Sequence, residues 1–232
     1  VTYSKHYSSP SAEATHFANF QENLNKINNH NEKHRRGLVS YTLAVNQFTD
    51  LSLDELSSYS QQTSNITKQG KDIFEERAAT PVRKDWRSEN VITSVEDQGT
   101  TCQASWAFSA AGAIESHLAI KHGKLITLSP QNLVDCTLSY CNRGCEGGKP
   151  ERAFHYVYDN GGIFYDHDCV SIAAFLQHSV LVVGYDVIGN QEYWIVKTSM
   201  GTRWGINGYI YMERHKGNLC GIATEASFPQ LK

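Results

Sequence analysis

Apolar residues recur with helical spacing in two stretches of the chain. In residues 13–34 they form a narrow seam among polar side chains, at Phe17, Phe20, Leu24 and Ile27, which predicts an amphipathic helix. A second stretch runs from Trp106 to Lys121, and Gly123 follows it as a stop signal. Ser105 therefore lies at the N-terminus of this second helix, where unpaired backbone N–H groups and the positive end of the helix dipole favour an anion or a nucleophile.

The last third of the chain has the pattern of β-strands. Apolar runs rich in valine occupy residues 178–187 and 193–198, with Gly189-Asn190 between them, which predicts a β-hairpin. Residues 208–214 and 220–228 are expected to add further strands. Residues 57–72, by contrast, are rich in Ser, Gln, Thr and Asn without apolar periodicity, so we interpret them as a linker.

The composition argues against several classes of protein. The 232 residues carry a net charge of −3, so no basic surface indicates nucleic-acid binding, and no apolar run approaches the roughly 18 residues of a membrane span. No Cys/His spacing matches a zinc site, and the pair His30 and His34 falls short of the four ligands that structural zinc needs. Neither a metal nor another cofactor is expected.

The cysteines and one sequon indicate the secretory route. The chain has six cysteines and the tripeptide Asn65-Ile66-Thr67, an acceptor for N-glycosylation unless it is unused. We therefore expect a lysosomal or extracellular monomer, glycosylated at Asn65, with a signal peptide outside this chain.

The segment Cys102-Gln103-Ala104-Ser105-Trp106 resembles the active-site signature C-G-[SA]-C-[WY] of papain-like cysteine peptidases, with serine in place of the nucleophilic cysteine. Alone, it would also fit the ordinary start of a core helix. Four further segments resemble the same family, at residues 128–136, 144–148, 178–185 and 197–205. The resemblance implies proteolysis by descent and an α+β papain-like fold, with a helical left domain and an antiparallel β-barrel right domain.

Two motifs near the N-terminus resemble the inhibitory propeptide of cathepsin-L-like enzymes. Phe20, Asn23, Ile27 and Asn31 reproduce F-x2-N-x3-I-x3-N, whereas Ala12 and His16 stand where the family has Glu and Arg. Residues 44–50 resemble G-x-N-x-F-x-D, with Ala for the first Gly.

The resemblance implies four segments and two kinds of partner. A propeptide domain is expected at residues 1–56, a linker through the cleft at 57–79, and truncated left and right domains at 80–161 and 162–232. The implied partners are peptide or protein substrates or ligands, and the chain's own propeptide in the cleft.

The resemblance also assigns the site residues. The catalytic positions are Gln98 as oxyanion donor, Ser105 as nucleophile, His178, and Thr198 in place of the asparagine that orients the histidine. The substrate-binding positions are Gly147, Gly148, Pro150 and Glu225. A carboxylate at the base of an apolar pocket would accept an arginine or lysine as well as a hydrophobic residue. In purely structural terms the two glycines would form a turn, and Glu225 would be a solvated surface residue.

The serine and the threonine change the expected chemistry. A cysteine beside an imidazolium forms a standing thiolate, whereas a serine hydroxyl needs a general base during attack. His178 is the candidate base, but Thr198 is shorter than asparagine and a weaker acceptor. In serine proteases, spoiling the orienting residue lowers kcat by about 10⁴-fold. We therefore expect catalytic impairment, although Gln98 is retained.

The spacing of the catalytic positions indicates a missing segment. His178 and Thr198 lie 73 and 93 residues after Ser105, whereas papain-like enzymes place the corresponding residues about 130–150 positions after the nucleophile, so roughly 60 residues are absent. The two sides of the gap meet near residues 161 and 162. By resemblance, Cys102 pairs with Cys145 and Cys169 with Cys220, which leaves Cys141 for Cys136.

Three interpretations follow from these residues. The first is a homologue with little or no peptidase activity that binds peptides or proteins. The second is a serine-dependent hydrolase on the same fold, similar to silicateins, although these keep the asparagine that this chain lacks. The third is a non-functional truncated product, since a barrel without its first strands leaves open sheet edges.

Overall fold

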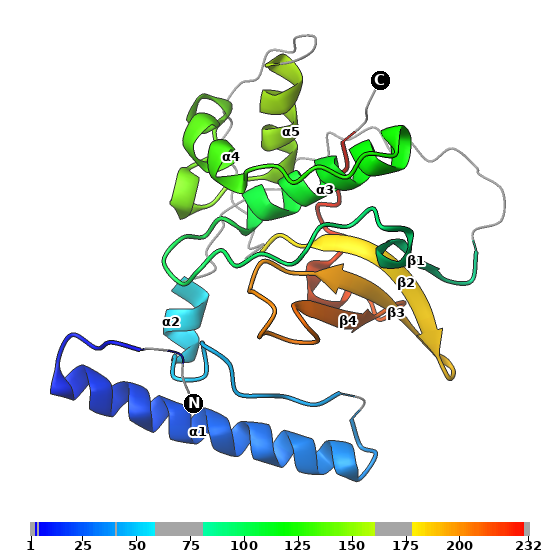
Figure 1. Cartoon of the computed structure of the whole chain (residues 1–232). Helices are drawn as coiled ribbons and strands as arrows, with labels where there is room; N and C mark the ends of the chain where they lie inside the picture. Colours follow the sequence, from blue (N-terminus) through cyan, green and yellow to red (C-terminus); the bar gives the residue numbers. More distant parts are fainter. Residues whose placement is uncertain (1–2, 4, 40, 59–80, 161–177, 230–232) are drawn as a thin grey trace. The chain divides into compact units, whose positions relative to one another are not determined.

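The computed structural model describes residues 3, 5–39, 41–58, 81–160 and 178–229, and the chain divides into two compact units, Val1–Ser60 and Gln61–Lys232. The first unit contains the helices α1 (Pro10–Arg35) and α2 (Leu53–Ser58), shown in Figure 1. Helix α1 is the predicted amphipathic helix. It begins three residues earlier than the apolar seam suggests, because the Ser9 side chain accepts the Ala12 N–H at 3.1 Å and Pro10 occupies the first turn.

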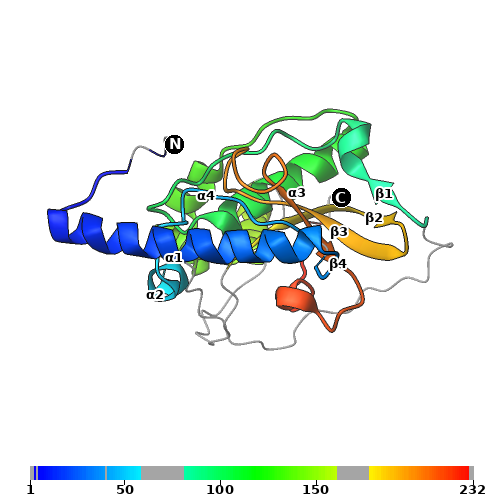
Figure 2. The same cartoon turned by 90° about the horizontal axis from the view of Figure 1, so that it is seen from below.

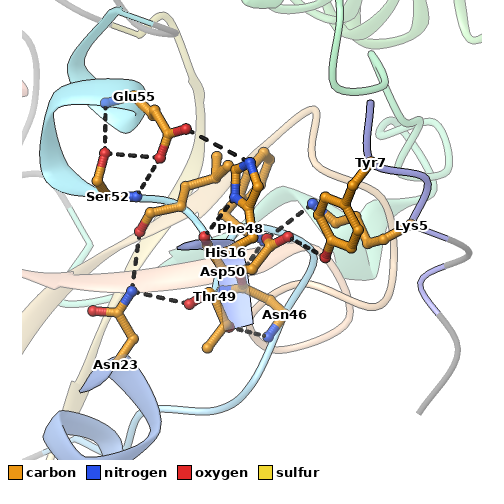
Figure 3. Close-up of polar contacts among 11 residues, drawn as sticks. Lys5, Tyr7, His16, Asn23, Asn46, Phe48, Thr49, Asp50, Ser52 and Glu55 are labelled. Atoms are coloured by element: carbon orange, nitrogen blue, oxygen red, sulfur yellow. Dashed lines mark hydrogen bonds and ion pairs between the residues drawn. The ribbon is translucent and has the colours of Figure 1, made fainter. Parts of the chain in front are cut away.

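Asparagines of the N-terminal motif fix an extended segment along α1. The Asn23 amide donates to the carbonyls of Thr49 and Leu51 at 2.9 and 3.0 Å, as Figure 3 shows for part of this network. At the end of the motif, Asn31 donates to Leu43 O and accepts from Leu43 N–H, both at 2.8 Å. The two asparagines thus have a direct structural role in the motif, because their side chains hydrogen-bond to backbone groups of a segment that does not belong to a sheet.

The second motif builds a tight turn around Asp50. Asn46 N–H donates to Thr49 Oγ1 at 2.8 Å, and Phe48 N–H donates to Asn46 Oδ1 at 2.9 Å. The Asp50 carboxylate accepts from Lys5 Nζ and Tyr7 Oη, each at 2.9 Å (Figure 3). Burial disfavours the charge on Asp50, but these two hydrogen bonds outweigh it and lower the pKa of the carboxyl.

The second unit places three helices on one side of a sheet. Helix α3 (Ser105–His122) contacts α4 (Pro130–Cys136), α5 (Pro150–Asp159) and the sheet (Figure 1). It is rich in alanine and buried on most sides, so small side chains allow close neighbours all round. Gly123 ends it in the left-handed conformation, with φ of 67°, as the sequence predicts.

The sheet is antiparallel throughout, in the order β1-β2-β3-β4 (Figure 2). Its strands are β1 (Lys84–Asp85), β2 (Leu181–Ile188), β3 (Gln191–Lys197) and β4 (Tyr209–Glu213). The predicted hairpin is β2–β3, and Gly189 supplies the positive φ of 61° that its two-residue turn requires. Short 3-10 helices lie at Trp86–Glu89, Leu138–Tyr140, Gly144–Glu146 and Leu219–Gly221.

The prediction of a strand at residues 220–228 is wrong. This segment forms a 3-10 turn and further turns instead. Asn218, Cys220 and Gly221 have φ angles of 59°, 53° and 74°, and left-handed backbone does not continue a β-strand.

Two apolar cores support the unit. One lies among the three helices and includes Trp106, Leu133 and Ala153, and the other lies on the sheet around Val183, Tyr193 and Ile195. Together, the helices and the antiparallel sheet give the α+β architecture that the resemblance implies.

Candidate active site

Ser105 is the first residue of α3 and is buried, with 3% of its surface exposed. The chain before it is held by the Cys102–Cys145 disulfide and by a hydrogen bond from Gln103 N–H to Cys145 O at 3.0 Å. The Ser105 Oγ accepts a hydrogen bond from the Ser179 backbone N–H at 3.2 Å. The helix thus presents the hydroxyl to the segment that carries His178, but the contact is made by the residue after the histidine.

His178 lies three residues before β2, and its Nε2 atom is buried without a hydrogen-bond partner. Burial lowers the pKa of this imidazole to about 4. Part of the His178 residue is accessible to solvent, but its Nε2 atom is not. The ring is therefore neutral over most of the acidic range and does not supply an imidazolium for an ion pair.

Thr198 follows β3, and its hydroxyl forms hydrogen bonds within the loop between β3 and β4. Its Oγ1 donates to Gly208 O at 2.9 Å and lies 3.4 Å from the Met200 N–H. The side chain is 7% exposed, and these bonds occupy it. Thr198, the predicted orienting residue, is therefore not bonded to His178.

Gln98 is fixed between two loops. Its Nε2 donates to Cys102 O at 3.1 Å, and its Oε1 accepts from Ser199 Oγ at 2.6 Å. The backbone around it pairs with the segment after β3, through Gln98 N–H to Ser199 O at 2.8 Å and Gly201 N–H to Glu96 O at 3.1 Å. Ser199 was not identified from the sequence, because its partner lies 101 residues away.

The local structure requires glycine at both predicted substrate-binding glycines, Gly147 and Gly148. Gly147 has φ of 111°, which side-chain-bearing residues rarely adopt. A Cβ atom on Gly148 would lie 2.7 Å from the Trp106 ring and 2.6 Å from Asn142 Oδ1. Both positions therefore require glycine even without a substrate, and the turn interpretation is sufficient for them.

Glu225 has a partner that the sequence did not reveal. The Lys149 Nζ donates to Glu225 Oε1 at 3.0 Å, and both side chains are about four-fifths buried. Lys149 lies between Gly148 and Pro150, the first residue of α5. A carboxylate that pairs with a lysine of the same chain attracts a cationic ligand less strongly than a bare carboxylate.

The cysteines beyond the first pair differ from the expected assignment. Cys136 and Cys220 are free and exposed, and Cys141 is engaged in a disulfide whose partner lies outside the described residues. Cys136 therefore has no Cys141 to pair with, and Cys220 is not part of a Cys169–Cys220 bond. Asn65 and Cys169 themselves lie outside the described residues.

The described part of the chain has no cluster of three or more His, Cys, Asp or Glu side chains arranged to hold a metal ion. Its helices are likewise too short or too polar to cross a membrane.

Comparisons with known proteins identify the family. The family described as "Papain family cysteine protease" matches residues 80–170 and 160–230, and the "Cathepsin propeptide inhibitor domain (I29)" matches residues 1–56. The chain is 33% identical to digestive cysteine proteinase 1 of Homarus americanus, with 90% of the chain and 86% of the relative aligned. It is 31% identical to cathepsin S of Bos taurus, with 99% and 90% aligned.

A solved structure gives the same result. Digestive procathepsin L 3 of Tenebrio molitor superposes with a TM-score of 0.83 at 33% identity, covering 98% of this chain and 95% of the other. The alignments to the two sequence relatives span 281 and 306 positions, more than the 232 residues here, so both contain residues that this chain lacks. The chain belongs to the papain family of cysteine peptidases, as a cathepsin-L-like homologue with a cathepsin propeptide domain.

Proposed function

We propose that this chain is a cathepsin-L-like proenzyme homologue in which peptide hydrolysis is lost or strongly reduced. One observation carries the proposal: none of Ser105, His178 and Thr198 is hydrogen-bonded to another of the three. Ser105 Oγ accepts from Ser179 N–H, His178 Nε2 has no partner, and Thr198 Oγ1 donates to Gly208 O. A serine nucleophile needs its base within hydrogen-bond reach and an orienting group behind that base.

The proposed remaining activity is the binding of peptide or protein ligands. Gly147 and Gly148 still provide a backbone without side chains beside Trp106, and Gln98 is still held beside the loop that precedes α3. The propeptide domain fits a role as the chain's own ligand in the cleft, through the linker 57–79. The segments 80–161 and 162–232 would then form the two walls.

We also propose a lysosomal or extracellular location and a monomeric state. The location is supported by the cysteine content, the disulfide between Cys102 and Cys145, and the sequon at Asn65. The serine-hydrolase alternative has no contact in its favour, because Ser105 and His178 are not hydrogen-bonded to one another.

Two active-site probes test the loss of catalysis. The full chain would be treated with a thiol-directed epoxide and, separately, with a fluorophosphonate, and the modified residues would be mapped by mass spectrometry. Mapping is essential because the exposed thiols of Cys136 and Cys220 can react without any active site. We expect no adduct at Ser105 and no turnover of a dipeptidyl fluorogenic substrate above that of Ser105→Ala. A fluorophosphonate adduct on Ser105 would establish the serine hydrolase instead.

A further inference from the structure

A buried charged cluster joins α3 to the sheet and lines the same cavity as Ser105 and Thr198. Glu115 and Lys197 are 3% and 9% exposed, and the Thr93 hydroxyl lies between them. Thr93 Oγ1 donates to Glu115 Oε2 at 2.6 Å, and Lys197 Nζ donates to Thr93 Oγ1 at 3.0 Å and to Thr93 O at 2.9 Å. The other Glu115 oxygen accepts from Leu128 N–H at 2.7 Å. The cluster therefore ties the helix, the sheet and the segment before the active-site loop together.

A second carboxylate lines the same cavity. Glu96 borders it together with Glu115 and Lys197, and the cavity has a volume of about 20 Å³. Glu96 is held in place by its backbone carbonyl, which accepts from Gly201 N–H at 3.1 Å. The cavity is therefore lined by one lysine and two glutamates. It carries a net charge of one negative unit when all three groups are ionised. The other side chains that line it are uncharged.

This surplus charge disfavours the ionised form of Glu96. Burial, followed by the charge of Glu115, raises the pKa of the Glu96 carboxyl, and Lys197 offsets only part of that effect. Burial also lowers the pKa of Lys197, against the attraction of Glu115 and Glu96.

We propose that Glu96 makes the contact between α3 and the sheet sensitive to pH, so that the contact is strongest when Glu96 is neutral and weaker when Glu96 is ionised. A group whose pKa is raised in the folded state contributes its full stabilisation at pH values below its pKa in the unfolded chain. That stabilisation is lost as the pH rises through the pKa of the group in the folded protein. This inference does not depend on whether the chain hydrolyses peptides.

The comparison of Glu96→Gln with the unmodified full chain tests the proposal. Glutamine keeps the size of the side chain and removes its charge. Urea unfolding at pH 5.0 and pH 7.5 gives the unfolding constant at each pH for both proteins. The unfolding constant should rise more from pH 5.0 to pH 7.5 in the unmodified chain than in Glu96→Gln. The difference between the two rises should be about twofold or more. Because a single proton is involved, it should stay below about tenfold per pH unit. His178 and Asp97 are present in both proteins, so their contributions cancel.

Glu146→Gln is the matched control, because Glu146 is an exposed glutamate of the same unit. It should keep the pH dependence of the unmodified chain. If Glu96→Gln does not fold, amide hydrogen exchange of α3 and β3 in the unmodified chain replaces it. Opening corrected for intrinsic exchange should then be greater at pH 7.5 than at pH 5.0. Equal pH dependence in Glu96→Gln and the unmodified chain, or equal opening at both pH values, would overturn the proposal.

Discussion

Replacing His178 with glutamine removes a buried imidazole that the fold holds in its neutral form. The pKa of His178 is lowered from 6.5 to about 4 by burial. Between these two values the folded protein binds fewer protons than the unfolded chain. The stability that this residue contributes is therefore complete above pH 6.5 and is lost as the pH falls toward 4.

The magnitude follows from the displacement of the pKa. Each unit corresponds to about 1.4 kcal/mol, so a shift from 6.5 to about 4 amounts to at most about 3 kcal/mol of unfolding free energy at pH 4. That is a large part of the roughly 5–15 kcal/mol of a typical domain. Partial exposure of the residue makes this figure an upper limit.

The assay is urea unfolding of the unmodified chain and of His178→Gln at several pH values from 7.0 to 4.5. The quantity of interest is how the difference between the two proteins changes with pH, since glutamine alters the absolute stability as well. We expect the unmodified chain to lose stability faster on acidification. His122→Gln, at an exposed position in the last turn of α3, is the control. Parallel pH dependence of the unmodified chain and His178→Gln would show that the imidazole is solvated, and would refute the reasoning.

Three further predictions concern the remaining site positions. Ser105→Cys alone should stay far below an intact cathepsin L in kcat/KM, because Thr198 bonds to its own loop, whereas parity for that single variant would show the threonine and the missing segment to be harmless. Lys149→Leu should free the Glu225 carboxylate, so that peptides with arginine as the second residue before the scissile bond bind more tightly relative to peptides with leucine there. Adding Glu225→Ala to this variant should remove the preference. An unchanged ratio of the two affinities in Lys149→Leu would mean that Glu225 faces no ligand pocket. Gly148→Ala should lower the unfolding free energy by about 1–3 kcal/mol or more, through the clash with Trp106 and Asn142, and an unchanged unfolding midpoint would contradict that packing.

The sequence by itself determined the main elements and the family. Periodicity located α1 and α3, and the helix-ending Gly123 and the hairpin turn at Gly189 follow from local backbone requirements. The candidate catalytic positions could also be proposed from the sequence, because they lie in short contiguous motifs. The absent segment could be counted from spacing alone.

Only the tertiary structure decided how these residues are bonded. The Ser179 N–H on Ser105, the Gly208 carbonyl on Thr198 and the Lys149 partner of Glu225 join residues 10–76 positions apart or engage the backbone of another element. No periodicity encodes such contacts, because a side chain chooses its partner from whatever the folded chain brings within reach. The same limit explains the mistaken strand at 220–228 and the free Cys136 and Cys220, since backbone handedness and disulfide choice depend on the neighbours that packing supplies.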